Sequence, residues 1–240
     1  MKYLFFTLLF TSLVYSQQNV IVKYNFHNAS VIENDTKEAV REMLEKTIAI
    51  ANNQKFELSF SDNRASFKCI DQLNMDSDNA LINITKLAFT SPDIYTDLEL
   101  RTQVTVQDDG TLVETKLNDT NWEVTSESKT IGDYLCYKAI FNKSFVDRYG
   151  ENKINKIVAW FAPSLPYRIG PKHFCGLPGL ILEVTEYDNT YLASNIELTD
   201  KKIDIKFPKG KIVVKEEYDK KMESSAGAIL LAKKRGAVKK

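Results

Sequence analysis

The fold of this 240-residue chain is decided by one stretch, Gly176-Leu177-Pro178-Gly179-Leu180-Ile181-Leu182-Glu183-Val184. The Pro178-Gly179 pair predicts a type II turn, because proline presets φ at the first central position and glycine supplies a positive φ at the second. The apolar run that follows predicts a buried strand. Upstream, Pro163 and Pro166 keep the chain extended and prevent it from pairing as a central strand. The segment therefore predicts a rigid apolar loop that leads into a core strand.

Short strands are predicted on both sides of this segment. Apolar residues alternate along them, and the turns at Asp62–Arg64 and Asp109-Gly110 join neighbouring strands into hairpins. Asn142–Lys153 is predicted to be a polar loop. Strands that follow one another by short turns indicate a mainly β (α+β) fold, with a strongly curved antiparallel sheet that forms an unclosed barrel. The predicted strands cover residues 20–26, 56–60, 65–69, 98–100, 104–106, 112–117, 122–126, 134–141, 154–161, 180–184 and 192–198.

Two helices are predicted, one toward each end of the chain. Apolar residues between Ala39 and Ala51 recur at helical spacing, and Asp35 is placed to cap this N-terminal helix. Because the helix has one apolar face, we expect it to lie on the sheet. Val213–Ser224 predicts a C-terminal helix. Between Ile70 and Pro92 we expect only a short helical turn or an edge strand.

The N-terminus predicts export. Lys2 is followed by the apolar run Leu4–Val14, and Val14 and Ser16 occupy the −3 and −1 positions of a cleavage site. Residues 1–16 are therefore interpreted as a signal peptide that is cleaved after Ser16, and the periplasm or cell envelope as the compartment. Residues 17–232 are expected to form a single domain. Residues 233–240 form a basic tail, either frayed or in peripheral contact with a membrane surface.

Composition excludes several functions. The chain has 32 basic and 32 acidic side chains, so its net charge of zero argues against nucleic-acid binding by phosphate neutralisation. Its two histidines argue against a multi-histidine metal centre, and we expect no metal and no cofactor. No nucleophile elbow or zinc-protease helix occurs, so we expect a protein that is not an enzyme.

The three cysteines allow at most one intramolecular disulfide. In an exported protein we prefer the pair Cys136–Cys175, with three buried thiols as the alternative. None of the cysteines has C-x-x-C spacing, so neither a zinc knuckle nor a thioredoxin-type motif is predicted.

Three segments between Trp122 and Val184 form a wider pattern. A tryptophan strand leads into Tyr134–Ala139, Ala159-Trp160-Phe161 precedes two prolines, and Gly176–Ile181 reads GLPGLI. This pattern resembles the GLPGLI family of exported Bacteroidetes proteins, from which Asp133 departs where the family has glycine. The resemblance implies a family motif and binding surface made of Trp160, Pro163, Pro166, Gly170, Pro171, Gly176, Leu177, Pro178, Gly179, Leu180 and Ile181.

The resemblance also implies a fold like that of periplasmic lipoprotein carriers, but no catalytic residue. Our leading hypothesis is an exported protein that binds a hydrophobic ligand or lipid, or an envelope partner, through its curved sheet. One alternative is an interaction subunit of an outer-membrane assembly, in contact with an outer-membrane protein and without a ligand. The other is a metal-binding protein or enzyme of the envelope that uses His173 and Cys175.

Overall fold

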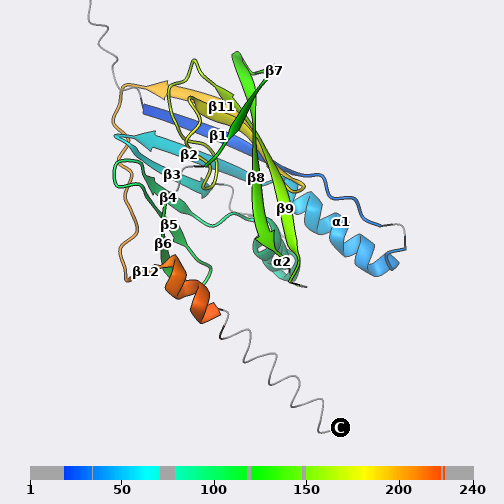
Figure 1. Cartoon of the computed structure of the whole chain (residues 1–240). Coiled ribbons are helices and arrows are strands. Elements are labelled where there is room, and N and C mark those ends of the chain that lie inside the picture. Colours follow the sequence, from blue (N-terminus) through cyan, green and yellow to red (C-terminus); the bar gives the residue numbers. More distant parts are fainter. Residues whose placement is uncertain are drawn as a thin grey trace, which may run out of the picture.

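A computed structural model describes residues 19–33, 35–70, 79–117, 120–147, 150–222 and 224 (Figure 1). The predicted signal peptide and basic tail lie outside the described residues. The helices are α1 (Glu38–Asn52), α2 (Asn79–Phe89) and a C-terminal helix over residues 215–222. The strands are β1 (Asn19–Asn28), β2 (Lys55–Ser61), β3 (Arg64–Cys69), β4 (Ile94–Asp97), β5 (Thr102–Val106), β6 (Leu112–Lys116), β7 (Glu123–Ile131), β8 (Tyr134–Val146), β9 (Asn152–Ala162), β10 (Leu180–Glu186), β11 (Asn189–Thr199) and β12 (Ile212–Val214).

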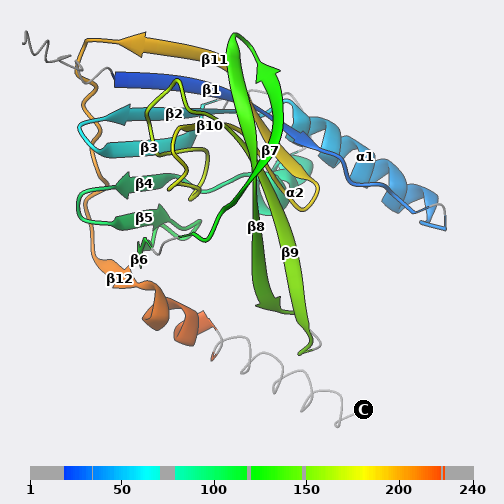
Figure 2. The same cartoon turned by 45° about the horizontal axis from the view of Figure 1, so that its top comes forward.

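All twelve strands belong to one sheet, in the order β12-β6-β5-β4-β3-β2-β1-β11-β10-β9-β8-β7. The sheet is unclosed and strongly curved, so that β8 and β9 cross the direction of β1–β6 (Figure 2). The prediction of a mainly β, curved and unclosed sheet is confirmed. The sheet is mixed and not fully antiparallel, because β12 pairs with β6 in the parallel direction.

The N-terminal helix is confirmed, but its predicted cap is wrong. The N-cap residue is Lys37, which makes no side-chain capping bond, and Asp35 lies outside the helix. The apolar face of α1 is buried only near its C-terminal end, at Thr47, Ile50 and Ala51. The N-terminal half of the helix therefore extends away from the sheet (Figure 1).

Three other segments differ from the prediction. The predicted strand at Leu98–Leu100 is a turn, because the Asp97 carboxylate accepts hydrogen bonds from the backbone N–H groups of Glu99 and Leu100. The region expected to hold a helical turn or an edge strand contains the eleven-residue helix α2 and then β4. The C-terminal helix begins later than predicted, because Val213 pairs with Val113 as part of β12.

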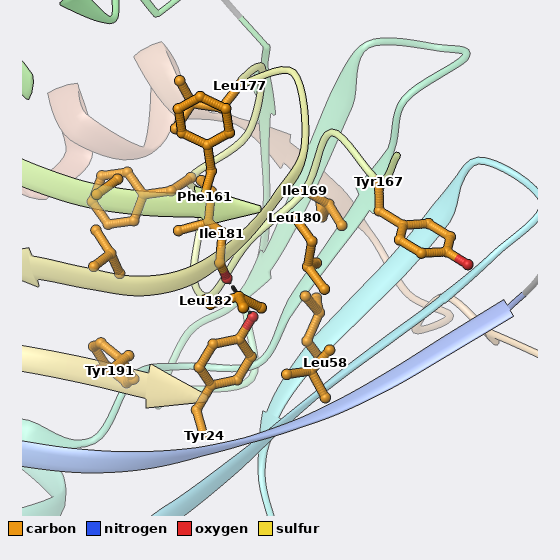
Figure 3. Close-up of a cluster of buried hydrophobic side chains, with 14 of the residues drawn as sticks. Tyr24, Leu58, Phe161, Tyr167, Ile169, Leu177, Leu180, Ile181, Leu182 and Tyr191 are labelled. Carbon is orange, nitrogen blue, oxygen red and sulfur yellow. Dashed lines mark hydrogen bonds between the residues drawn. The ribbon is translucent and has the colours of Figure 1, made fainter. Parts of the chain in front are cut away.

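The main core lies on the concave side of the sheet. Its centre is an aromatic cluster in which Phe56 stacks on Phe67 and both contact Tyr191 edge-on. The loop over residues 163–179 packs on this cluster, and its side chains at Leu165, Ile169 and Leu177 are buried with it. Figure 3 shows Ile169 of the loop close to Leu180, at the start of β10. The loop therefore fills the centre of the concave face, while α2 contacts the core at one end through its Phe89.

The two glycines of the Gly176–Ile181 segment have different roles. Gly176 has a φ of +95°, a conformation that costs other residues strain. Gly179 does not adopt positive φ, so the predicted type II turn centred on Pro178 and Gly179 is wrong. A Cβ atom at Gly179 would lie 2.3 Å from the carbonyl oxygen of Ala162. The segment therefore needs glycine at this position for close backbone approach.

The loop is joined to β10 by backbone hydrogen bonds. The N–H of Leu180 donates to the carbonyl of Leu165 at 2.9 Å, and the N–H of Ile181 donates to that of Ile169 at 3.0 Å. The Ile181 carbonyl accepts a 2.7 Å hydrogen bond from the buried Tyr24 hydroxyl (Figure 3). A β-bulge follows between Ile181 and Glu183. The polar backbone of the loop is thereby satisfied within the core.

Gly179→Ala is predicted to destabilise the protein by at least about 3 kcal/mol, because the new methyl group meets rigid backbone and not a movable side chain. The matched control is Gly176→Ala, where the Cβ would have open space and only the positive φ is unfavourable. This control substitution is expected to lower the free energy of unfolding by about 1–2 kcal/mol. Urea unfolding measures both values. Equal losses in the two variants would contradict the close-approach role of Gly179.

Candidate functional site

The structure places the predicted motif residues in two different environments. Leu177, Leu180 and Ile181 are buried in the core, and a Cβ at Gly170 would lie within 2.6 Å of the Ile181 side chain. These residues form the junction between the loop and β10. Because they are buried, these residues pack in the core. In the described chain the motif residues therefore do not form one exposed surface.

Trp160 lies on the other face of the sheet. On β9 it points away from its neighbours Ala159 and Phe161, which are buried in the core. The Lys129 ammonium group lies 4.4 Å from the centre of the indole ring and 2.6 Å from the Glu183 carboxylate. Trp160 is thus part of a cation–π and ion-pair network on the convex face.

The structure contains no disulfide between any of the three cysteines, so the predicted Cys136–Cys175 bond is not formed. Cys136 and Phe141 are five residues apart on β8, which places them on opposite faces of the strand. Phe141 contacts Trp122, whose indole N–H donates to the carbonyl of Cys175. Cys175 therefore lies on the Phe141 side of the sheet, and Cys136 lies on the Trp160 side. Burial raises the pKa of Cys136 to about 11.

The site of interest is a cavity of about 620 Å³ between the two arms of the curved sheet. One wall is formed by β4, β5 and β6, where Ile94, Thr105 and Val113 are in register across the three strands. Phe141 of β8 belongs to the opposite wall. Tyr218 of the C-terminal helix also lines the cavity. Its volume lies within the roughly 300–1,000 Å³ that is typical of small-molecule sites.

Residues 172–175 of the loop form a further wall, and hydrogen bonds hold this wall from two sides. The Gln103 amide on β5 donates to the His173 carbonyl at 3.4 Å. The Trp122 indole donates to the Cys175 carbonyl at 3.1 Å. Since His173 and Cys175 belong to the loop that is anchored on β10, the cavity and the core share one structural element.

Charges at this wall are held in defined protonation states. Burial, followed by the positive charges of Lys172 and Lys143, lowers the pKa of His173 to about 4. His173 is therefore neutral at pH 7. Burial acts to raise the pKa of Glu186, but its ion pair with Lys172 contributes to a net lowering, so Glu186 is ionised.

His173 and Cys175 both line the cavity, as the metal or enzyme hypothesis requires. Within the described residues, however, no group of three or more histidine, cysteine, aspartate or glutamate side chains could hold a metal ion. His173 and Cys175 are thus two of the residues that line the cavity. Also within those residues, no helix has the length and apolar character needed to cross a membrane.

The cavity walls include residues that the sequence did not single out. Phe141 and Lys143 lie on β8, which continues to Val146 through the region predicted as a polar loop. That prediction is wrong because β8 and β9 pair through this region as a long two-stranded ribbon (Figure 2). Most of its polar side chains are exposed, which gives the sequence the polar character of a loop. Phe145 continues the odd-numbered apolar positions Tyr137, Ala139 and Phe141, and this was the signal that could have extended the strand.

Comparison with known proteins supports the fold but assigns no activity. Residues 147–183, which include β9 and the loop, match a family described as "Protein of unknown function (Porph_ging)". No curated protein matches the chain. Solved structures of PNGF-II in the P21 and C2 space groups are similar, with TM-scores of 0.51 and 0.50 and 14% sequence identity. They cover 85% and 82% of this chain, which spans only 32% and 31% of theirs. At this identity the likeness shows a shared β-rich fold alone.

The neutral state of His173 predicts a pH dependence of stability. Between pH 6.5 and about 4 the unfolded chain binds a proton at this residue and the folded chain does not, so stability falls as pH falls. His173→Asn removes this loss, which amounts to at most about 3 kcal/mol.

Urea unfolding from pH 8 to pH 4 measures the effect. At pH 8 the difference between the two proteins reports packing alone, and toward pH 4 it should shift in favour of the variant. A difference that is constant with pH would contradict the buried, neutral state of His173.

Proposed function

We propose that this chain is an exported, non-enzymatic protein that holds a small apolar ligand in the cavity between the two arms of its curved sheet. The observation that carries the proposal is the cavity itself. Buried apolar side chains at Ile94, Val113 and Phe174 line it, and polar groups at Gln103 and Thr105 lie beside them. An apolar surface with a few convergent polar groups is typical of ligand sites.

The resemblance to the GLPGLI family supports the same proposal. The family motif at Gly176–Ile181 is the junction that anchors the loop, and the loop forms a wall of the cavity. We propose that the chain is a GLPGLI-type protein whose motif preserves the cavity and does not contact the ligand. The half-barrel form of periplasmic lipoprotein carriers, which hold lipids, is the fold-level analogy for this role.

Export is the other part of the proposal. The apolar run at Leu4–Val14, with its cleavage site after Ser16, supports a location in the periplasm or cell envelope. In that setting an apolar ligand would need a carrier to cross an aqueous space, and a partner in the outer membrane would receive or supply it.

Binding of the neutral, apolar fluorescent dye N-phenyl-1-naphthylamine tests the proposal. We expect the dye to bind with enhanced fluorescence and Thr105→Trp to weaken binding about tenfold, because an indole at the centre of the β5 wall occupies part of the cavity and obstructs it. Thr130→Trp is the matched control, since Thr130 is exposed on β7 and lies outside the cavity.

If Thr105→Trp does not fold, Thr115→Trp on β6 provides a second obstruction of the same cavity. Circular dichroism establishes that each variant is folded. Absence of dye binding to the wild type, or equal binding by a folded blocked variant and the Thr130→Trp control, would contradict the proposed function.

A further inference from the structure

The cavity has an apolar interior and a basic rim. Val113, Phe174 and Ile94 are buried at its interior, whereas the lysines that line it are exposed or half-buried. Among the described residues that line the cavity there are no aspartates or glutamates. The lysines of the rim are Lys116, Lys143, Lys172 and Lys215.

Two of the four lysines are neutralised and two are not. Lys172 pairs with Glu186, and Lys215 pairs with Asp219 at 2.8 Å. Lys116 and Lys143 form no ion pair with any residue in the part of the chain that the structure describes. Among the described residues, the rim therefore has an excess of positive charge that no ion pair compensates.

Lys143 is the best placed of the unpaired lysines. It follows Phe141 by two residues on β8, so the two side chains lie on the same side of the strand. The positive charge of Lys143 acts on the groups at the loop wall, since it contributes to lowering the pKa of both His173 and Glu186. Along β8, the apolar wall at Phe141 is thus next to the exposed ammonium group of Lys143.

We propose that the ligand is a single-chain amphiphile with an anionic headgroup, a carboxylate or a phosphate, whose chain lies on the apolar interior and whose headgroup is bound by Lys143. This inference rests on the proposed function and adds the ligand's chemical class. A volume of about 620 Å³ suits one chain and its headgroup. Lysine binds both kinds of anion through charge-assisted hydrogen bonds.

Displacement of N-phenyl-1-naphthylamine by four twelve-carbon probes tests the inference below their micellar concentrations. The probes are dodecanoate, dodecyl phosphate, dodecanol and dodecyltrimethylammonium, which share a chain and differ in headgroup. We expect at least one anionic probe to bind about tenfold more tightly than dodecanol, and the cation to bind most weakly. Tighter binding of dodecanoate identifies a fatty-acid-like ligand, and tighter binding of dodecyl phosphate a phospholipid-like one.

Lys143→Gln is expected to weaken binding of the preferred anion three- to tenfold and to leave binding of dodecanol unchanged. Lys156→Gln is the matched control, because Lys156 is an exposed lysine on β9 that lies outside the cavity. Lys156→Gln makes the same change in charge and is expected to leave the affinities for the preferred anion and for dodecanol unchanged. Added salt should reduce the preference for the anion in the wild type and have less effect in Lys143→Gln.

Two results would overturn the inference. One is binding of dodecanol or the cation as tightly as both anions, and the other is an equal effect of Lys143→Gln and Lys156→Gln. Either result leaves the proposed function intact, since the cavity would still bind apolar chains. Failure of all four probes to displace the dye from the cavity would count against the proposed function itself.

Discussion

The structure depends on the docking of the 163–179 loop against the first two residues of β10. Two backbone hydrogen bonds, donated by the N–H groups of Leu180 and Ile181, join the loop to β10. Without them, polar backbone groups would be left unpaired inside an apolar core. The Tyr24 hydroxyl satisfies the Ile181 carbonyl from the β1 side. Gly179 permits the approach, because a larger residue would collide with the backbone of Ala162. These contacts all involve the Gly176–Ile181 segment and its direct neighbours, so one short stretch of sequence holds the loop in place.

The docked loop links the core to the candidate site. One part of it packs on the aromatic cluster of β1–β3, and the part at His173–Cys175 forms a wall of the cavity. The hydrogen bonds from Gln103 and Trp122 fix that wall between the two arms of the sheet. The β10 junction and the cavity wall therefore belong to the same loop. In the proposed function, the motif holds the loop without contacting the ligand, and the lysines at the rim of the cavity select the ligand.

Sequence reasoning predicted those parts of the fold in which local pattern and tertiary environment agree. β1 alternates because one face is buried, and the Asp109-Gly110 turn joins β5 and β6 as expected. It failed where a single side chain or a distant strand decides the structure. Asp97 converts an apparently alternating segment into a turn, and pairing with β6 makes a strand of Val213. Periodicity contains no information about either contact.

The candidate site was predicted only in part for the same reason. The loop was recognised, and His173 and Cys175 do line a cavity, but the opposite walls come from strands more than 25 residues away in sequence. Hydrogen–deuterium exchange at the amides of Leu180 and Ile181 tests the docking of the loop most directly. If these amides donate to the loop within the core, they exchange as slowly as the amides of the central strand β1. Exchange at the rate of exposed turns such as Asp109-Gly110 would contradict the account.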